Sequence, residues 1–141
     1  MKILLFLFSF SIYSFELKPF ETDGCTFIID KPIFSKKKSF KYCCFLHDIS
    51  YWIGGSRDQR SRSDKELRRC IKNESNGFYG TIFYFGVRTG HLSPIKSRFK
   101  WGWGRSDDNF SVPTSFVLDK ADEQFNRADV KNYLKTIYSK K

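Results

Sequence analysis

The sequence predicts a small, mainly α-helical domain whose core is an antiparallel pair of helices tied together by disulfide bonds. Helical signals cover residues 40–53 and 58–72, and the glycines Gly54 and Gly55 between them are a typical helix stop. Because the link is short, the two helices are expected to form an antiparallel hairpin. The chain also has four cysteines, and this even number favours two disulfide bonds if the protein is exported.

The N-terminus has the features of a secretory signal peptide. Residues 1–14 begin with Met1-Lys2, continue as a short apolar run and end in small residues. The run is too short to span a bilayer, and a buried N-terminal helix or strand is the alternative. Cleavage can follow Ser11, Ser14 or Phe15. We therefore expect a secreted or periplasmic protein without a transmembrane segment, with one mature domain over residues 15–141.

The charge balance predicts an anionic partner. The sequence contains 25 Lys and Arg residues against 15 Asp and Glu residues, which gives a formal net charge of +10. A basic, exported protein rich in Phe, Tyr and Trp suits an anionic phospholipid surface, where rings settle at the headgroup level. Nucleic acid is the rival partner for such charge. Export and the scattered basic residues argue against it, and oligomeric state is not predicted.

Two further segments complete the predicted fold. Residues 78–105 are aromatic, β-branched and glycine-rich, and they predict a short aromatic β-hairpin or extended segment. Within it, His91 is interpreted as a turn or surface residue, and Trp101 and Trp103 as core or turn packing rather than a membrane belt. The amphipathic stretch 120–138 predicts a C-terminal helix that packs on the core.

Chemically active residue types concentrate in the segment Cys43–Trp52. On an α-helix each residue turns by about 100°, so His47 and Tyr51 share one face. Cys44 and Asp48 share another face, roughly a quarter-turn away. The first predicted helix therefore presents two separate chemical surfaces.

Helix geometry also relates these residues to Asp64 on the second predicted helix. If Cys43 and Cys70 were bridged, the rise of about 1.5 Å per residue would place Asp64 between His47 and Tyr51, within hydrogen-bonding reach of both. Helical angles alone do not decide whether Cys43 or its neighbour meets Cys70.

The pairing of the cysteines is left open by the residues themselves. A bond between the neighbours Cys43 and Cys44 is strained, so each of them is expected to join Cys25 or Cys70. A structural zinc ion held by the four thiolates is the competing interpretation. Adjacent ligands on one helix fit poorly with the spaced pairs of such zinc sites.

The pattern Cys-Cys-x-x-His-Asp-x-x-Tyr at residues 43–51, followed by an Asp six residues before Cys70, resembles the secreted phospholipase A2 superfamily. The resemblance covers about fifty residues and implies a phospholipase A2 type of two-helix core. It implies that His47 is the general base, that Asp64 orients it and that Tyr51 supports the pair. It also implies disulfide bonds between Cys25 and Cys44 and between Cys43 and Cys70.

The same resemblance implies a calcium site. Asp48 would supply a carboxylate, and the loop around Cys25, residues 23–30, would supply backbone oxygens of Gly24 or Thr26 and of Ile28. The loop departs from the family pattern, because Thr26 and Ile28 stand where glycines are expected. In one alternative, the side chains of Asp23 and Asp30 supply the calcium ligands instead. In the other, the protein is a non-hydrolytic relative of the family.

The sequence therefore predicts a calcium-dependent hydrolase that releases a fatty acid from a glycerophospholipid. The alternative is a catalytically inactive lipid-surface binder or toxin-like module on the same scaffold. A basic structural protein with incidental cysteines is a third possibility, in which replacement of His47 would remove nothing specific.

Overall fold

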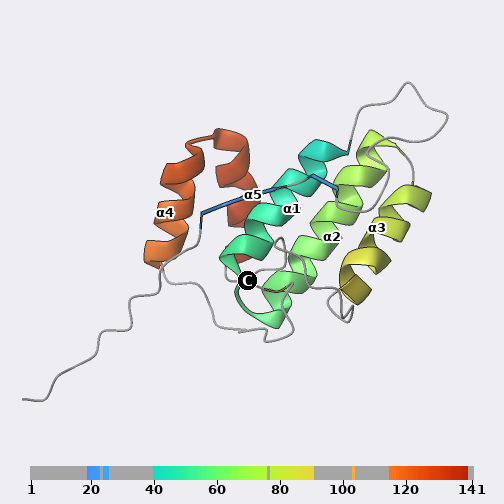
Figure 1. Ribbon diagram of the computed structural model, residues 1–141, viewed down its shortest axis with the longest axis horizontal. Helices are drawn as coiled ribbons and strands as arrows, with labels where there is room; N and C mark the ends of the chain where they lie inside the picture. The colour runs from blue at the N-terminus through green and yellow to red at the C-terminus, as the bar shows by residue number, and fades with distance from the viewer. Residues whose placement is uncertain are drawn as a thin grey trace, which may run out of the picture.

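The computed structural model describes residues 19–22, 24–25, 40–75, 77–90, 103 and 115–139. These residues form five helices and no strand: α1 (Lys41–Ile53), α2 (Arg57–Glu74), α3 (Gly77–Gly90), α4 (Ser115–Phe125) and α5 (Ala128–Tyr138). Figure 1 shows α1 and α2 side by side at the centre, with α3 against α2 on one side and α4 and α5 on the other. The mainly helical class is confirmed, and the predicted signal peptide, residues 1–14, lies outside the described residues.

The turn between α1 and α2 follows from its local sequence. Helix α1 ends at Ile53, because Gly54 and Gly55 adopt φ angles of +80° and +132° that favour glycine. Helix α2 begins at once with a capping box, in which the Ser56 hydroxyl accepts from the Gln59 amide and the Gln59 side chain accepts from the Ser56 amide. The chain therefore reverses within three residues.

Contacts between α1 and α2 confirm the antiparallel hairpin. They run in opposite directions along the two helices: Cys43 with Cys70, His47 with Asp64, and Ser50 with Ser63. The second disulfide bond joins Cys25 to Cys44 and fastens the N-terminal segment to α1. Both bonds match the pairing that the resemblance implies, and the zinc interpretation of these thiols is wrong.

One apolar cluster surrounds the disulfides between α1, α2 and α3. Its buried members outside the cystines are Phe40, Leu67, Ile71 and Phe83. A second cluster lies on the opposite side of α1, against α4 and α5, and includes Ile49, Trp52, Ala121, Val130 and Leu134. The two clusters leave a polar layer at the centre of the α1–α2 contact.

The prediction of an extended aromatic segment is wrong for residues 78–90, which belong to α3. The amino-acid composition of this segment favours a strand, but tertiary packing decides between a strand and a helix. A strand would turn Phe83 and Phe85 to the same face, whereas the structure buries Phe83 and exposes Phe85. A helix separates them and packs Tyr79, Phe83 and Val87 against the disulfide-centred cluster. Residues 91–102 and 104–105 of the predicted segment lie outside the described residues.

The prediction of one helix over 120–138 is also wrong, because two helices occupy this region. Helix α4 starts earlier, at Ser115, and ends at Phe125, where Asn126 adopts a φ of +40° and its amide donates to the Asp122 carbonyl. Asparagine tolerates this left-handed conformation better than most residues. The break turns the chain, so that α4 and α5 both reach α1.

The packing of α3 on α2 depends on Gly80. A Cβ atom at this position would lie 2.7 Å from the backbone oxygen of Arg68. We predict that Gly80→Ala forces the two helices apart and lowers the free energy of unfolding by about 1–3 kcal/mol in urea denaturation. Gly77→Ala in the same helix is the matched control, because a Cβ there meets nothing within 4 Å. Equal stability of the two variants would contradict this account of the interface.

Candidate active site

The polar layer between α1 and α2 is centred on the carboxylate of Asp64, which is fully buried (0% exposed). Its Oδ1 atom lies 3.1 Å from Nε2 of His47 and accepts a hydrogen bond of 2.7 Å from the Tyr51 hydroxyl. Its Oδ2 atom accepts from the guanidinium of Arg88 at 3.2 Å. The structure thus brings together His47, Tyr51 and Asp64 as the helical spacing predicted.

These contacts determine the charge of Asp64. Burial by itself raises the pKa of this carboxyl group, but the hydrogen bonds from His47, Tyr51 and Arg88 outweigh it and lower the pKa below its ordinary value. Asp64 is therefore ionised at neutral pH and can only accept hydrogen bonds.

The ionised carboxylate also selects the tautomer of His47. Because Asp64 accepts, Nε2 of the imidazole carries the hydrogen, and Nδ1 of the neutral ring carries the lone pair. Nδ1 has no hydrogen-bond partner among the described residues, and the His47 side chain is 6% exposed. A ring nitrogen with a free lone pair and an acid behind the opposite nitrogen is the arrangement of a general base.

Aromatic contacts hold the imidazole in place. The ring centroids of His47 and Tyr51 lie 4.2 Å apart, and Trp103 packs edge-on against Tyr51 at 5.3 Å. The indole Nε1 of Trp103 donates to the Gly55 carbonyl at 2.8 Å, and its ring is fully buried. Burial and the charge of Asp64 raise the pKa of Tyr51, so it remains a hydrogen-bond donor. Core packing of Trp103 is confirmed, whereas Trp101 and His91 lie outside the described residues.

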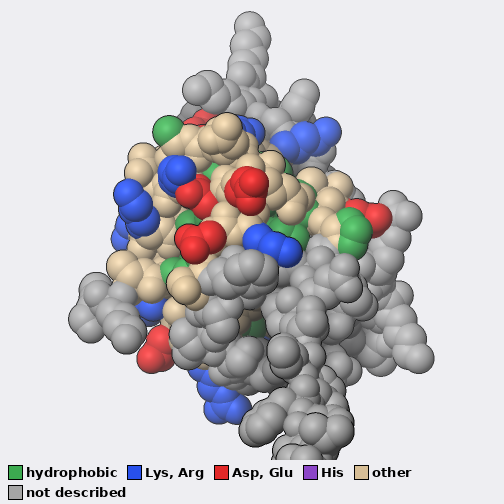
Figure 2. All heavy atoms as spheres, turned by 90° about the vertical axis from the view of Figure 1, so that its left-hand side faces the viewer, with side chains coloured by type: hydrophobic (Ala, Val, Ile, Leu, Met, Phe, Trp, Pro, Cys, Tyr) green, Lys and Arg blue, Asp and Glu red, His purple; other side chains and the backbone are tan. Residues whose placement is uncertain are grey.

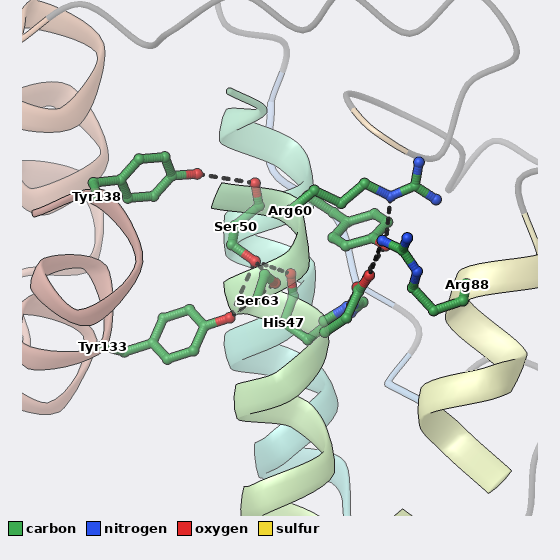
Figure 3. Close-up of polar contacts among 9 residues, drawn as sticks. His47, Ser50, Arg60, Ser63, Arg88, Tyr133 and Tyr138 are labelled. Atoms are coloured by element: carbon green, nitrogen blue, oxygen red, sulfur yellow. Dashed lines mark hydrogen bonds and ion pairs between the residues drawn. The ribbon is translucent and has the colours of Figure 1, made fainter. Parts of the chain in front are cut away.

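A second set of hydrogen bonds, on the side of α1 that faces α5, supports the backbone of α1. The Ser50 hydroxyl donates to the His47 carbonyl at 2.7 Å and contacts Ser63 and Tyr133 (Figure 3). The hydroxyl of Tyr138 donates to the carbonyls of Ser50 and Gly54, at 3.1 and 2.8 Å. Helix α5 is therefore fastened to the segment of α1 that carries the histidine.

Sequence reasoning missed four residues that shape this site: Arg88, Ser63, Tyr133 and Tyr138. Arg88 lay in the segment predicted to be extended, so nothing related it to Asp64. Ser63 and Ser50 could have been found, since each lies on the inner face of its helix in the antiparallel register. Tyr133 and Tyr138 lay in the predicted amphipathic C-terminal helix, whose apolar spacing gave no sign that their hydroxyl groups form hydrogen bonds.

The structure places Asp48 on a different face of α1, next to the N-terminal segment. Its Oδ2 atom accepts a hydrogen bond of 2.6 Å from the Thr22 hydroxyl, which in turn accepts from the Gly24 amide at 3.0 Å. The Cys25–Cys44 bond holds this segment beside α1. Asp48 and Gly24 are therefore close to one another, whereas Thr26 and Ile28 lie outside the described residues.

This region supplies part of what a calcium ion needs. Calcium takes six to eight oxygen ligands, and many of them can be backbone carbonyls or water. The carboxylate of Asp48 is suitable, and the left-handed φ of Gly24 (+75°) gives the loop a tight turn beside it. No group of three or more His, Cys, Asp or Glu side chains with metal-binding geometry occurs among the described residues.

Comparison with known proteins yields no relatives. No family model, no curated protein and no solved structure matches this chain. Among the described residues no helix combines the length and the hydrophobicity needed to cross a membrane.

The buried carboxylate generates a prediction about pH. The folded pKa of Asp64 lies below the unfolded value of about 3.9, so its contribution to stability is complete above that value and is lost as pH falls through the folded pKa. We predict that Asp64→Asn lowers the free energy of unfolding by about 1–3 kcal/mol at pH 7, because the donors lose a charged acceptor. The difference from the wild type should shrink below about pH 4.

Denaturant unfolding from pH 2 to pH 7 measures this difference. Asp58→Asn is the matched control, since Asp58 is an exposed acid in the first turn of the same helix. The control should change stability by no more than about 0.5 kcal/mol at any pH. Parallel pH profiles for wild type and Asp64→Asn would refute the assigned ionisation state.

Proposed function

We propose that this chain is a secreted hydrolase of the phospholipase A2 type, which cleaves a fatty acyl ester of a glycerophospholipid. The single observation that carries the proposal is the buried contact of His47 Nε2 with Asp64, which leaves Nδ1 with the lone pair. The sequence resemblance and the two disulfide bonds support the same conclusion. Ester cleavage is the reaction class, because the site offers a base for water and needs no serine nucleophile.

In the proposed reaction, Nδ1 of His47 takes a proton from water as the water oxygen attacks the ester carbonyl carbon. The tetrahedral intermediate then collapses, the bond to the glycerol oxygen breaks, and the imidazolium returns its proton to that oxygen. Asp64 stays ionised and stabilises the transient positive charge on the ring, while Tyr51 and Arg88 fix the carboxylate. The products are a free fatty acid and a lysophospholipid.

We further propose that calcium binds at Asp48 together with the backbone oxygens of Gly24, Thr26 and Ile28. A bound calcium ion supplies positive charge that stabilises the developing oxyanion. The protein would contribute the carboxylate of Asp48, which Thr22 positions, and the crosslink that keeps Cys25 beside α1. The catalytically inactive lipid-binding module remains the second candidate, because Thr26 and Ile28 replace the glycines expected in that loop.

Replacement of the base tests the hydrolase directly. We predict that His47→Gln, in purified oxidised protein, lowers fatty acid release from phospholipid vesicles by at least about 10²-fold, because general-base catalysis contributes about 10²–10⁴ in rate. Circular dichroism and urea unfolding should show that the variant remains folded. His91→Gln, which changes the only other histidine, is the control and should keep wild-type activity. A folded His47→Gln protein with full activity would exclude this mechanism.

Calcium dependence is a separate prediction. We expect a calcium chelator to abolish hydrolysis, and added calcium to restore it, because the oxyanion needs positive charge beside it. Asp48→Asn should raise the calcium concentration needed for half-maximal activity by tenfold or more, since one anionic ligand is lost. Glu66→Gln, which removes an acid paired with Arg69, is the control. Activity that is unchanged by chelation would remove calcium from the proposal but leave the role of His47 standing.

A further inference from the structure

The outward side of α3 exposes large apolar side chains in a single stripe. Phe78, Ile82 and Phe85 are 68%, 41% and 60% exposed, and they lie at positions i, i+4 and i+7 of the helix. Among the described residues, Tyr42 on α1 is the only other large hydrophobic residue exposed to a similar degree. We refer to Phe78, Ile82 and Phe85 as the α3 outer face.

Basic residues border this face. Helix α3 runs antiparallel to α2, and its contacts follow a regular register: Arg88 with Asp64, Tyr84 with Arg68, and Gly80 with Lys72. Both Arg68 and Lys72 are exposed, and the guanidinium of Arg68 lies 5.8 Å from the Tyr84 ring. Helix α3 itself contains no acidic residue. The exposed guanidinium groups of Arg68 and Arg88 therefore lie on the flank of α3 that carries Tyr84, next to the α3 outer face, whereas Gly80 contacts α2 on the inner side.

The opposite side of the molecule differs in its distribution of charged side chains. Figure 2 looks at the side where α4 lies, and it shows Asp and Glu side chains close to Lys and Arg side chains. Acidic residues of α4 and α5 include Asp119, Asp122, Glu123 and Asp129, and two of them pair with Lys131 and Arg127. Among the described residues, the α4 and α5 side thus pairs acidic with basic side chains, whereas α3 combines three exposed apolar side chains with no acidic residue.

We propose that the α3 outer face docks onto an anionic phospholipid bilayer, with its three apolar side chains at the level of the headgroups and acyl chains. Aromatic and aliphatic side chains gain free energy by leaving water at this depth, and Arg68 and Arg88 next to the face are attracted to anionic headgroups. A protein partner would also fit an apolar stripe, but the charge pattern favours an anionic surface.

The position of α3 relates this docking face to the candidate active site. Arg88 is only three residues from Phe85, and its guanidinium reaches the Asp64 carboxylate that contacts His47. Figure 3 shows Arg88 extending from α3 toward the polar contacts between α1 and α2. The proposal deepens the proposed function, because it names the surface with which a phospholipase of this fold would meet a bilayer. Binding does not require catalysis, however, and each can be tested alone.

Vesicle sedimentation tests the docking face. Full-length oxidised protein is mixed with sucrose-loaded vesicles of phosphatidylglycerol and phosphatidylcholine, or of phosphatidylcholine alone. The His47→Gln background prevents hydrolysis during the measurement. We expect preferential binding to the anionic vesicles, and a loss of at least tenfold in partition coefficient for Phe78→Ser/Phe85→Ser. Both side chains are exposed, so the variant should fold, as circular dichroism and thermal unfolding will show.

Matched controls come from the other side of the molecule. Tyr42→Ser removes an exposed aromatic ring from α1, and it should change vesicle binding by less than twofold. Arg68→Glu should weaken the preference for anionic vesicles, whereas Lys135→Glu on α5 should preserve it. Unchanged binding in the double phenylalanine variant would overturn the proposal. Self-association in the absence of vesicles that this variant abolishes would also overturn it, because the face would then be a protein interface.

A monomeric short-chain phosphatidylcholine separates docking from catalysis. Protein with the native His47 should hydrolyse this substrate equally well with and without Phe78→Ser/Phe85→Ser, while the same substitutions slow hydrolysis of anionic vesicles at least tenfold. Vesicle binding without hydrolysis of either substrate would refute the proposed function and leave the docking face intact. Hydrolysis of the monomeric substrate, combined with vesicle binding that the α3 substitutions leave unchanged, would refute the docking face alone.

Discussion

The buried carboxylate of Asp64 is the constraint on which the arrangement of helices depends. An ionised group without contact to water costs several kcal/mol unless hydrogen bonds and opposite charge compensate it. Here the compensation comes from α1 through His47 and Tyr51, and from α3 through Arg88. Because all three donors must reach one carboxylate on α2, the positions of three helices are coupled. A shift of any helix would leave a buried acceptor unsatisfied.

The disulfides and apolar clusters place that carboxylate where it can be satisfied. The bond between Cys43 and Cys70 sets the register of the hairpin one helical turn from His47. On the other side of α1, the hydroxyls of Tyr133 and Tyr138 form hydrogen bonds with Ser50. These bonds fix the position of α5 along α1. The polar layer is thus enclosed between a crosslinked cluster and a cluster formed by α4 and α5. This enclosure fixes the position and orientation of the imidazole.

The sequence predicted the features that depend on short-range spacing and failed where long-range packing decides. The Gly54-Gly55 stop, the hairpin and the meeting of His47 with Asp64 follow from helical rise and angle within one pair of helices. Helix α3 could not be recognised, since its Phe, Tyr and Ile content favours a strand and only the neighbouring α2 makes a helix preferable. Arg88 was missed for the same reason, because its partner lies 24 residues earlier on another helix.

The unusual composition of α3 follows from the two environments that the helix must meet at once. Its inner side needs a residue as small as Gly80 to approach the α2 backbone, and a residue as long as Arg88 to reach Asp64. Its outer side exposes aromatic rings, which a helix packed only for stability has no reason to carry. Polar residues at Phe78 and Phe85 would cost the fold little, because neither side chain is buried. The requirements of the core therefore do not account for their presence, which is the observation that the proposed docking face addresses.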